Sequence, residues 1–169
     1  MSSFLKYAIA RWLAGFGLAL MLAACATGSR LVPHAFNFNG WNDGWAQTAV
    51  LLEFSYGDRY AMVRDRSTDG RSVGVQWSVN GPMPVGEFLY VKWRLQASGE
   101  TVEQRVDLRE RLPRDMTDHE LTFVIDGRQL YVYVVTPERK KAYGEPPVLK
   151  TWRSNFAKAY EIYPQQASR

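Results

Sequence analysis

The stretch Leu121-Thr-Phe-Val-Ile-Asp-Gly-Arg-Gln-Leu-Tyr-Val-Tyr-Val-Val135 decides the fold of this chain. Two runs rich in β-branched and aromatic residues, 121–126 and 130–135, flank the pair Gly127-Arg128. Runs of this composition favour strands. Glycine after aspartate accepts the positive φ of a tight turn between two strands. The stretch therefore predicts an antiparallel β-hairpin.

Apolar and polar residues alternate in several further segments. The clearest case is 90–96, where Val91, Trp93 and Leu95 are separated by polar residues. This period of two is typical of a strand with one buried face. The segment 73–79 alternates in the same way, and Asn80-Gly81-Pro82 predicts a turn after it. Two more strands are expected at 50–56 and 101–108.

Helical periodicity is scarce in this chain. We expect a helical turn at 114–119 and a short helix at 154–160. The predicted fold class is therefore mainly β, a compact antiparallel β-sandwich or curled sheet with one or two short helices.

The N-terminal residues follow another pattern. Lys6 and Arg11 give this region a positive charge, and the apolar run 12–24 has the length of a signal-peptide core. The run is shorter than the roughly 20 residues that span a bilayer. It ends in Leu22-Ala23-Ala24-Cys25, which resembles the lipobox of bacterial lipoprotein signal peptides. The resemblance implies cleavage before Cys25 and lipid attachment to its thiol. An ordinary secretory signal and an N-terminal anchor helix are the alternatives.

These observations divide the chain into three parts. Residues 1–24 are a predicted signal peptide, 25–33 a lipidated cysteine with a short tether, and 34–169 a single β-rich domain. Ala26, rather than aspartate, follows the cysteine. By resemblance to lipoproteins of Gram-negative bacteria, this favours the inner leaflet of the outer membrane, with the domain facing the periplasm. Multiple acyl chains make such an anchor effectively permanent.

Composition limits the chemistry of the domain. Two of the 21 Lys and Arg residues lie in the signal peptide, and no Asp or Glu does, which leaves a net charge near +2. Such a charge gives no reason to expect nucleic acid as a partner. With a single cysteine, neither an intramolecular disulfide nor a cysteine-based zinc site can form. We expect no cofactor or metal, only the lipid on Cys25.

The polar residues that could hold a metal ion have ordinary interpretations. His34 and His119 are far apart in sequence, and neither has a carboxylate at a familiar ligand spacing. Asp115, Asp118 and Glu120 are close together but are interspersed with basic residues. We interpret them as the surface of a turn.

Gly70-Arg71-Ser72-Val73-Gly74 fits the Gly-x-Ser-x-Gly formula of serine hydrolases. Asp107, Asp115 and His119 follow in an order that suits a catalytic triad. A nucleophile elbow requires a strand before the serine and a helix after it. Here a polar loop precedes Ser72 and a strand-like run follows it. We therefore expect no catalytic site and no enzymatic activity.

Aromatic, asparagine and glycine residues crowd the segment 36–45. Phe36 and Phe38 fit the inner face of a first strand. Trp41 and Trp45 have two interpretations: they cover the end of the sheet, or they anchor a partner protein or a sugar ring. On the second interpretation, Trp41, Asp43 and Trp45 are candidate partner-binding residues.

Mixed charges mark two more candidate surfaces. Arg64, Asp65 and Arg66 lie in one charged segment, and arginine is suited to bidentate contacts with carboxylates of a partner. We name them as further candidate partner-binding residues. The short basic cluster 139–141 could face anionic lipid or lipopolysaccharide.

A broader resemblance covers most of the chain beyond the lipobox. It is carried by Val79-Asn80-Gly81, Val85-Gly86, Val91-Lys92-Trp93-Arg94, Val106-Asp107-Leu108-Arg109 and Leu112-Pro113. These patterns resemble small β-rich outer-membrane lipoproteins of proteobacteria, some of which are encoded beside type VI secreted phospholipase toxins and act as their immunity proteins.

The resemblance implies a membrane-anchored, non-catalytic inhibitor of a secreted antibacterial toxin of the lipase class, with a phospholipase as its cognate partner. The alternative function is an envelope-maintenance lipoprotein that binds glycan or an envelope assembly machine. An enzyme that uses Ser72 is a third hypothesis.

Overall fold

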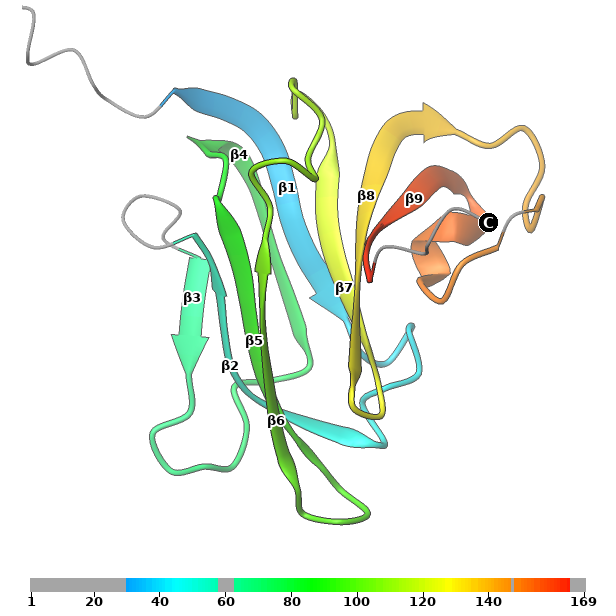
Figure 1. Cartoon of the computed structure of the whole chain (residues 1–169). Coiled ribbons are helices and arrows are strands. Elements are labelled where there is room, and N and C mark those ends of the chain that lie inside the picture. The colour runs from blue at the N-terminus through cyan, green and yellow to red at the C-terminus, as the bar shows by residue number, and fades with distance from the viewer. Residues whose placement is uncertain (1–29, 58–62, 147, 165–169) are drawn as a thin grey trace, which may run out of the picture. The chain divides into compact units, whose positions relative to one another are not determined.

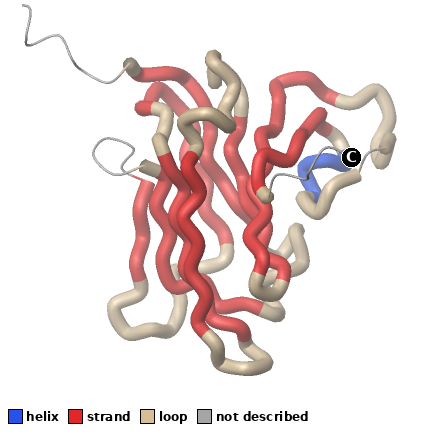
Figure 2. Tube along the Cα trace, in the orientation of Figure 1, coloured by secondary structure: helices blue, strands red, loops and turns tan. Residues whose placement is uncertain are grey.

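The computed structural model describes residues 30–57, 63–146 and 148–164, without the side chains of Val63 and Arg64. The predicted signal peptide, Cys25 and most of the predicted tether lie outside these residues. Within them the chain is mainly β, as the sequence predicts (Figures 1 and 2).

The strands form two facing sheets. The five-stranded sheet has the order β4 (Gln76–Pro84), β1 (Leu31–Asn39), β7 (Glu120–Asp126), β8 (Gln129–Arg139) and β9 (Ala157–Tyr163). The four-stranded sheet has the order β3 (Val63–Arg66), β2 (Ala49–Tyr56), β5 (Phe88–Leu95) and β6 (Thr101–Asp107). One 3-10 helix, η1 (Trp152–Asn155), is present among the described residues. All pairings are antiparallel except that of β1 with β7.

Aromatic rings fill the space between the two sheets. Phe36 of β1 stacks on Tyr56 of β2, with ring centroids 5.2 Å apart. Phe38 of β1 lies 5.0 Å from Phe54 of β2 and 4.6 Å from Phe123 of β7. These three contacts join strands of both sheets through one strand, so β1 is the centre of the core. The inward orientation expected for Phe36 and Phe38 is confirmed.

The predicted hairpin 121–135 is confirmed. Asp126 pairs with Gln129, and Gly127 in the two-residue turn has a φ of 57°. Its strands are buried on both faces, because Phe123 points into the sandwich while Thr122 and Tyr133 are also buried. The segment that carries η1 covers this second face, as shown by the contacts of Arg153 with Asn37 and Glu120. Both faces of the hairpin therefore require apolar side chains, which explains its near-continuous apolar sequence.

The pairing of β1 with its neighbours defines two ends of the sandwich. β1 and β7 begin at one end, where β8 finishes, and we call it the Leu31 end. β1 finishes at the opposite end, which carries the turns 40–48 and 127–128 and is here called the Trp41 end. The strand begins at Leu31, so residues 31–33 belong to the sheet rather than to a tether ending at 33.

The turn predicted at Asn80-Gly81-Pro82 is wrong. These residues continue β4, and Pro82 lies opposite Pro33 of β1. β4 is an edge strand, so the N–H that proline lacks is not needed by a further neighbour. Gly81 adopts a φ of 145°, which glycine accepts without strain.

Both helical segments expected from the sequence differ from those observed. Residues 114–119 form no helix, because Asp115 Oδ1 accepts hydrogen bonds from the N–H and Oγ1 of Thr117 and closes a local turn. The helix expected at 154–160 is wrong beyond Asn155, where η1 finishes. From Ala157 the chain is β9, because its backbone pairs with β8.

Truncating the centre of the core tests this architecture. We expect Phe36→Ala to lower the free energy of unfolding by about 3–5 kcal/mol, the usual cost of removing a buried phenyl ring. Leu31→Ala, on the same strand but at a side chain 59% exposed, is the control and should change it by less than about 0.5 kcal/mol. Urea titration of the two variants measures the difference. Equal losses would contradict a core centred on β1.

Candidate functional site

An exposed tryptophan stands on a tightly hydrogen-bonded turn at the Trp41 end. We call residues 39–46 the Trp41 turn. Trp41 is 61% exposed, in contrast to the other aromatic side chains of the segment 36–45. The N–H of Asp43 donates to the carbonyl of Asn39 over 3.0 Å, and that of Ala46 donates to Gly40 over 2.9 Å. These bonds fix the backbone that carries the indole.

The side chain of Trp45 packs between the Trp41 turn and the core. Its side chain is 2% exposed and lies with its ring centroid 6.2 Å from that of Phe38. A Cβ on Gly40 would lie 2.8 Å from the Trp45 ring, so the turn closes directly over the indole. The candidate role of Trp45 as an exposed partner anchor is therefore wrong. Trp45 therefore covers the end of the sheet, which was one of the two interpretations of the tryptophans. The side chain of Trp41 is exposed at the surface.

Asp43 fastens the turn to η1. Its Oδ1 accepts a hydrogen bond of 2.8 Å from the N–H of Trp152, although the two residues are far apart in sequence. Burial raises the pKa of Asp43 to about 6, and hydrogen bonds from Trp152 and Thr151 oppose the shift. Asp43 thus holds the turn in place, and its carboxylate faces the protein rather than a partner.

A polar cluster lies under η1 on the second face of the five-stranded sheet. Arg153 donates from Nη2 to Asn37 Oδ1 over 2.7 Å, and its Nε lies 2.9 Å from Glu120 Oε1. The Nε hydrogen does not point at that oxygen, so the second contact is an ion pair without a hydrogen bond. Burial raises the pKa of Glu120, while the Arg153 charge lowers it. The cluster fixes η1 against β1 and β7.

Sequence reasoning did not find this cluster. Asn37, Glu120 and Arg153 come from β1, β7 and η1, and no local pattern links them. The one available signal was polar residues within otherwise apolar strands, at Asn37 and Glu120. The guanidinium of Arg153 also lies 4.8 Å from the ring of Trp152. This half-buried aromatic side chain therefore lies next to the polar cluster.

The charged candidates lie elsewhere. Asp65 and Arg66 belong to β3, at the edge of the four-stranded sheet, and Arg66 Nε lies 3.9 Å from Glu53 Oε2. Arg64 also belongs to β3, although its side chain is outside the described part of the structure. Figure 1 shows β3 at the left edge, away from the turn that follows β1. The structure therefore does not combine Arg64, Asp65 and Arg66 with Trp41 in one surface.

The possible catalytic triad is not assembled. Ser72 lies in the loop before β4 at the Trp41 end, where its Oγ accepts a hydrogen bond of 3.0 Å from the N–H of Gly74. His119 directly precedes β7 at the opposite end, with its Nδ1 2.8 Å from the carbonyl of Thr117. Asp107 forms an ion pair with Arg109. These residues are engaged locally and in separate places.

The histidine at position 34 is part of the core. Its Nδ1 lies 2.8 Å from the carbonyl of Val32 and its Nε2 3.0 Å from Tyr56 Oη. Within the described ranges, no group of three or more His, Cys, Asp or Glu side chains is placed to hold a metal ion.

In the part that the structure describes, no helix has the length and apolar character needed to cross a bilayer. Comparisons with protein-family models, with curated proteins and with solved structures gave no match.

The raised pKa of Asp43 predicts a pH-dependent stability. The folded chain holds this proton up to about pH 6, whereas the ordinary value is 3.8, so folding takes up a proton between these values. Raising the pH through this interval therefore disfavours the fold. Asp43→Asn keeps an acceptor for the Trp152 N–H but cannot titrate.

We expect the stability of the unmodified chain, relative to Asp43→Asn, to fall by about 1–2 kcal/mol between about pH 4 and pH 7. Solvent screening of a partly exposed carboxylate keeps the effect below the full value of the shift. Urea titrations of both proteins over this range measure it, and the contributions of other groups cancel in the difference. Parallel curves would show that Asp43 does not titrate as described.

Proposed function

We propose that this protein is a lipoprotein anchored to the periplasmic face of the outer membrane, where it binds and inhibits a secreted antibacterial toxin of the lipase class. It acts as an immunity protein, without catalysis. The observation that carries the proposal is the exposed Trp41 on its rigid turn, because binding by a non-catalytic inhibitor needs an anchor of this kind. The lipobox and the β-rich resemblance supply the location and the class of partner.

The rigidity of the turn favours tight binding. Tryptophan is among the residues that most often dominate interface energies. A side chain on a mobile loop loses part of that contribution to the cost of ordering the loop. The turn around Trp41 is already fixed by backbone hydrogen bonds and by the Asp43 contact with Trp152. The backbone that carries the indole is therefore ordered before any partner arrives.

The length of β1 separates the Trp41 turn from the Leu31 end, which follows the proposed lipid anchor in sequence. β1 has nine residues, so Leu31 and Asn39 are separated by about 26 Å at roughly 3.3 Å per residue. In sequence, Cys25 precedes Leu31, the first residue of β1. The Trp41 turn at the other end is accessible to a toxin in the periplasm. Lipid anchoring raises the concentration of the inhibitor near the bilayer that a lipase attacks.

A capture and inhibition experiment tests this function. The mature lipoprotein, purified in detergent from the producing strain, is used to capture its partner, and the captured hydrolase is assayed on a phospholipid substrate. We expect a secreted lipase that is fully inhibited at an equimolar amount of the lipoprotein. Retention on peptidoglycan, without an inhibited lipase, would contradict the proposal and favour the envelope-maintenance alternative.

The role of Trp41 is tested in the same assay. We expect Trp41→Ala to raise the lipoprotein concentration for half-inhibition at least about 30-fold, which corresponds to the loss of a hot-spot contact of roughly 2 kcal/mol. Tyr160→Ala is the matched control, since it removes another exposed aromatic side chain, on β9, and should leave inhibition unchanged. Inhibition that is unaffected by Trp41→Ala would place the interface elsewhere.

A further inference from the structure

A basic hollow lies where β8 finishes and β9 begins. Its volume is about 740 Å³. It is lined by residues of the end of β8, the following loop and the start of β9: Glu138, Arg139, Lys140, Lys141, Glu145, Pro146, Lys158 and Ala159. We call it the β8–β9 hollow.

The charges of the hollow leave an excess of cations. Lys158 forms an ion pair with Glu138, so these two charges offset each other. All the residues that line the hollow sum to a formal net charge of +2, with four cations, Arg139, Lys140, Lys141 and Lys158, against the two carboxylates of Glu138 and Glu145. The Lys140 ammonium donates to the backbone carbonyl of Glu145, which keeps this side chain beside the hollow. An anion is therefore the ligand that the hollow attracts.

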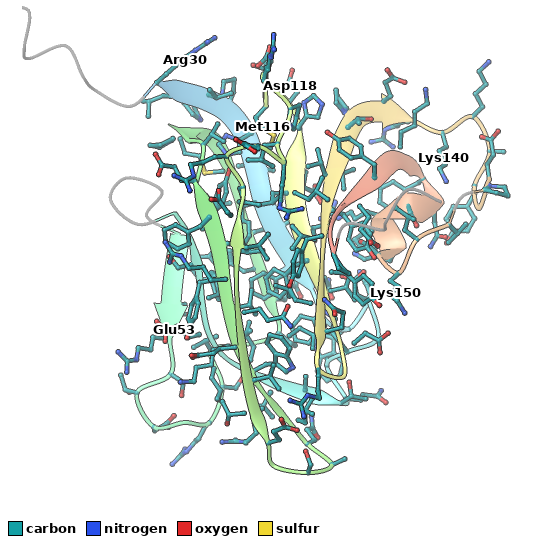
Figure 3. The ribbon with its side chains drawn as sticks, in the orientation of Figure 1. Arg30, Glu53, Met116, Asp118, Lys140 and Lys150 are labelled. Atoms are coloured by element: carbon teal, nitrogen blue, oxygen red, sulfur yellow. The ribbon has the colours of Figure 1, made fainter. Side chains whose placement is uncertain are left out.

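Strand register places this hollow at the Leu31 end. Ala35 of β1 pairs with Glu120 of β7, which in turn pairs with Val135 of β8. Leu31 is four residues before Ala35, and Arg139 is four residues after Val135. β1 and β8 are antiparallel to each other, so both steps lead toward the same end of the sheet. Figure 3 shows the labelled Lys140 in the upper half of the view, together with Met116 and Asp118 just before β7, whereas Lys150 lies lower.

An exposed tyrosine lies in the loop that lines the hollow, between Lys141 and Glu145 in sequence. Tyr143 is 80% exposed, and the next residue is held by a hydrogen bond of 2.9 Å from the Gly144 N–H to the Asn155 carbonyl. Tyrosine is enriched at the boundary between membrane and water, because its ring is apolar and its hydroxyl is polar. Basic residues beside such a tyrosine match a surface of phosphate headgroups.

We propose that the β8–β9 hollow binds the phosphate groups of anionic phospholipids in the leaflet to which the chain is anchored. This inference rests on the lipid anchor of the proposed function but not on the toxin. The contact holds the Leu31 end against the membrane, so that the Trp41 end faces away from it. The hollow thus orients the domain for its partner.

The net charge of the hollow is large enough to orient an anchored domain at a membrane but too small to recruit a soluble domain to it. One cation near an anionic leaflet contributes about a fivefold preference, so a net charge of +2 gives roughly 30-fold. Alone, this would bind a soluble domain weakly. For a domain already held at the surface by lipid, the same factor is enough to make one orientation predominant.

The test uses the mature lipidated protein in vesicles of phosphatidylethanolamine, with or without phosphatidylglycerol. Ala142→Cys, in the exposed loop beside the hollow, introduces a thiol for an environment-sensitive dye, because Cys25 is blocked by lipid. We expect the dye to report an apolar environment only in vesicles that contain phosphatidylglycerol. The signal should disappear in about 1 M salt, where the screening length is roughly 3 Å.

Charge variants identify the surface responsible. With the same dye, the pair Arg139→Gln and Lys141→Gln should reduce the ratio of docked to undocked protein about 30-fold. Arg128→Gln removes a cation at the Trp41 end and should change nothing, which controls for the loss of positive charge away from the hollow. A dye signal equal in neutral and anionic vesicles would overturn the proposal, and so would an equal response to inorganic phosphate in neutral vesicles. Toxin inhibition in detergent should be unchanged by the pair, so the two proposals fail separately.

Discussion

The packing of Phe36 and Phe38 between the two sheets is the contact on which the rest of the structure depends. These rings touch β2 on one side and β7 on the other, so a single strand sets the distance between the sheets. No disulfide is available to the domain, and burial of such rings stabilises it instead. Because β1 is held by these contacts along its length, the segments that adjoin its two ends are held in position as well. The position of the Trp41 turn is therefore a consequence of the core.

The second face of the five-stranded sheet explains why that turn is rigid. β7 and β8 are buried on both faces, and the segment with η1 supplies the second cover. Burying polar groups there costs free energy unless they are paired. Arg153 pairs with Glu120 and Asn37, and the backbone of Trp152 pairs with Asp43. The same contacts that cover the sheet thus hold the turn, and the charge on Asp43 is tolerated at a cost that its raised pKa expresses.

The sequence predicted elements whose information is local. Residues 121–135 carry their own strand-forming composition and turn signal, residues 90–96 carry their own alternation, and both predictions are confirmed. Elements that depend on a distant neighbour were missed. Asn80-Gly81-Pro82 looks like a turn unless β4 is known to be an edge strand, and β9 becomes a strand through β8. Trp41 and Trp45 occupy similar local sequence, and only packing against Phe38 and Phe123 separates the exposed side chain from the buried one.

The two ends of β1 impose different requirements on the sequence. At the Trp41 end, the proposed recognition of a toxin requires a fixed backbone, which is supplied by hydrogen bonds and by the indole of Trp45 beneath the turn. At the Leu31 end, the proposed attraction to phosphate requires only a few cations in a hollow, because the proposed lipid on Cys25 would supply most of the attachment. About 26 Å of strand separates these surfaces, so substitutions at one end should contribute independently of those at the other. On this view β1 determines how the proposed toxin site is oriented relative to the membrane. The affinities of the two surfaces can still be changed separately.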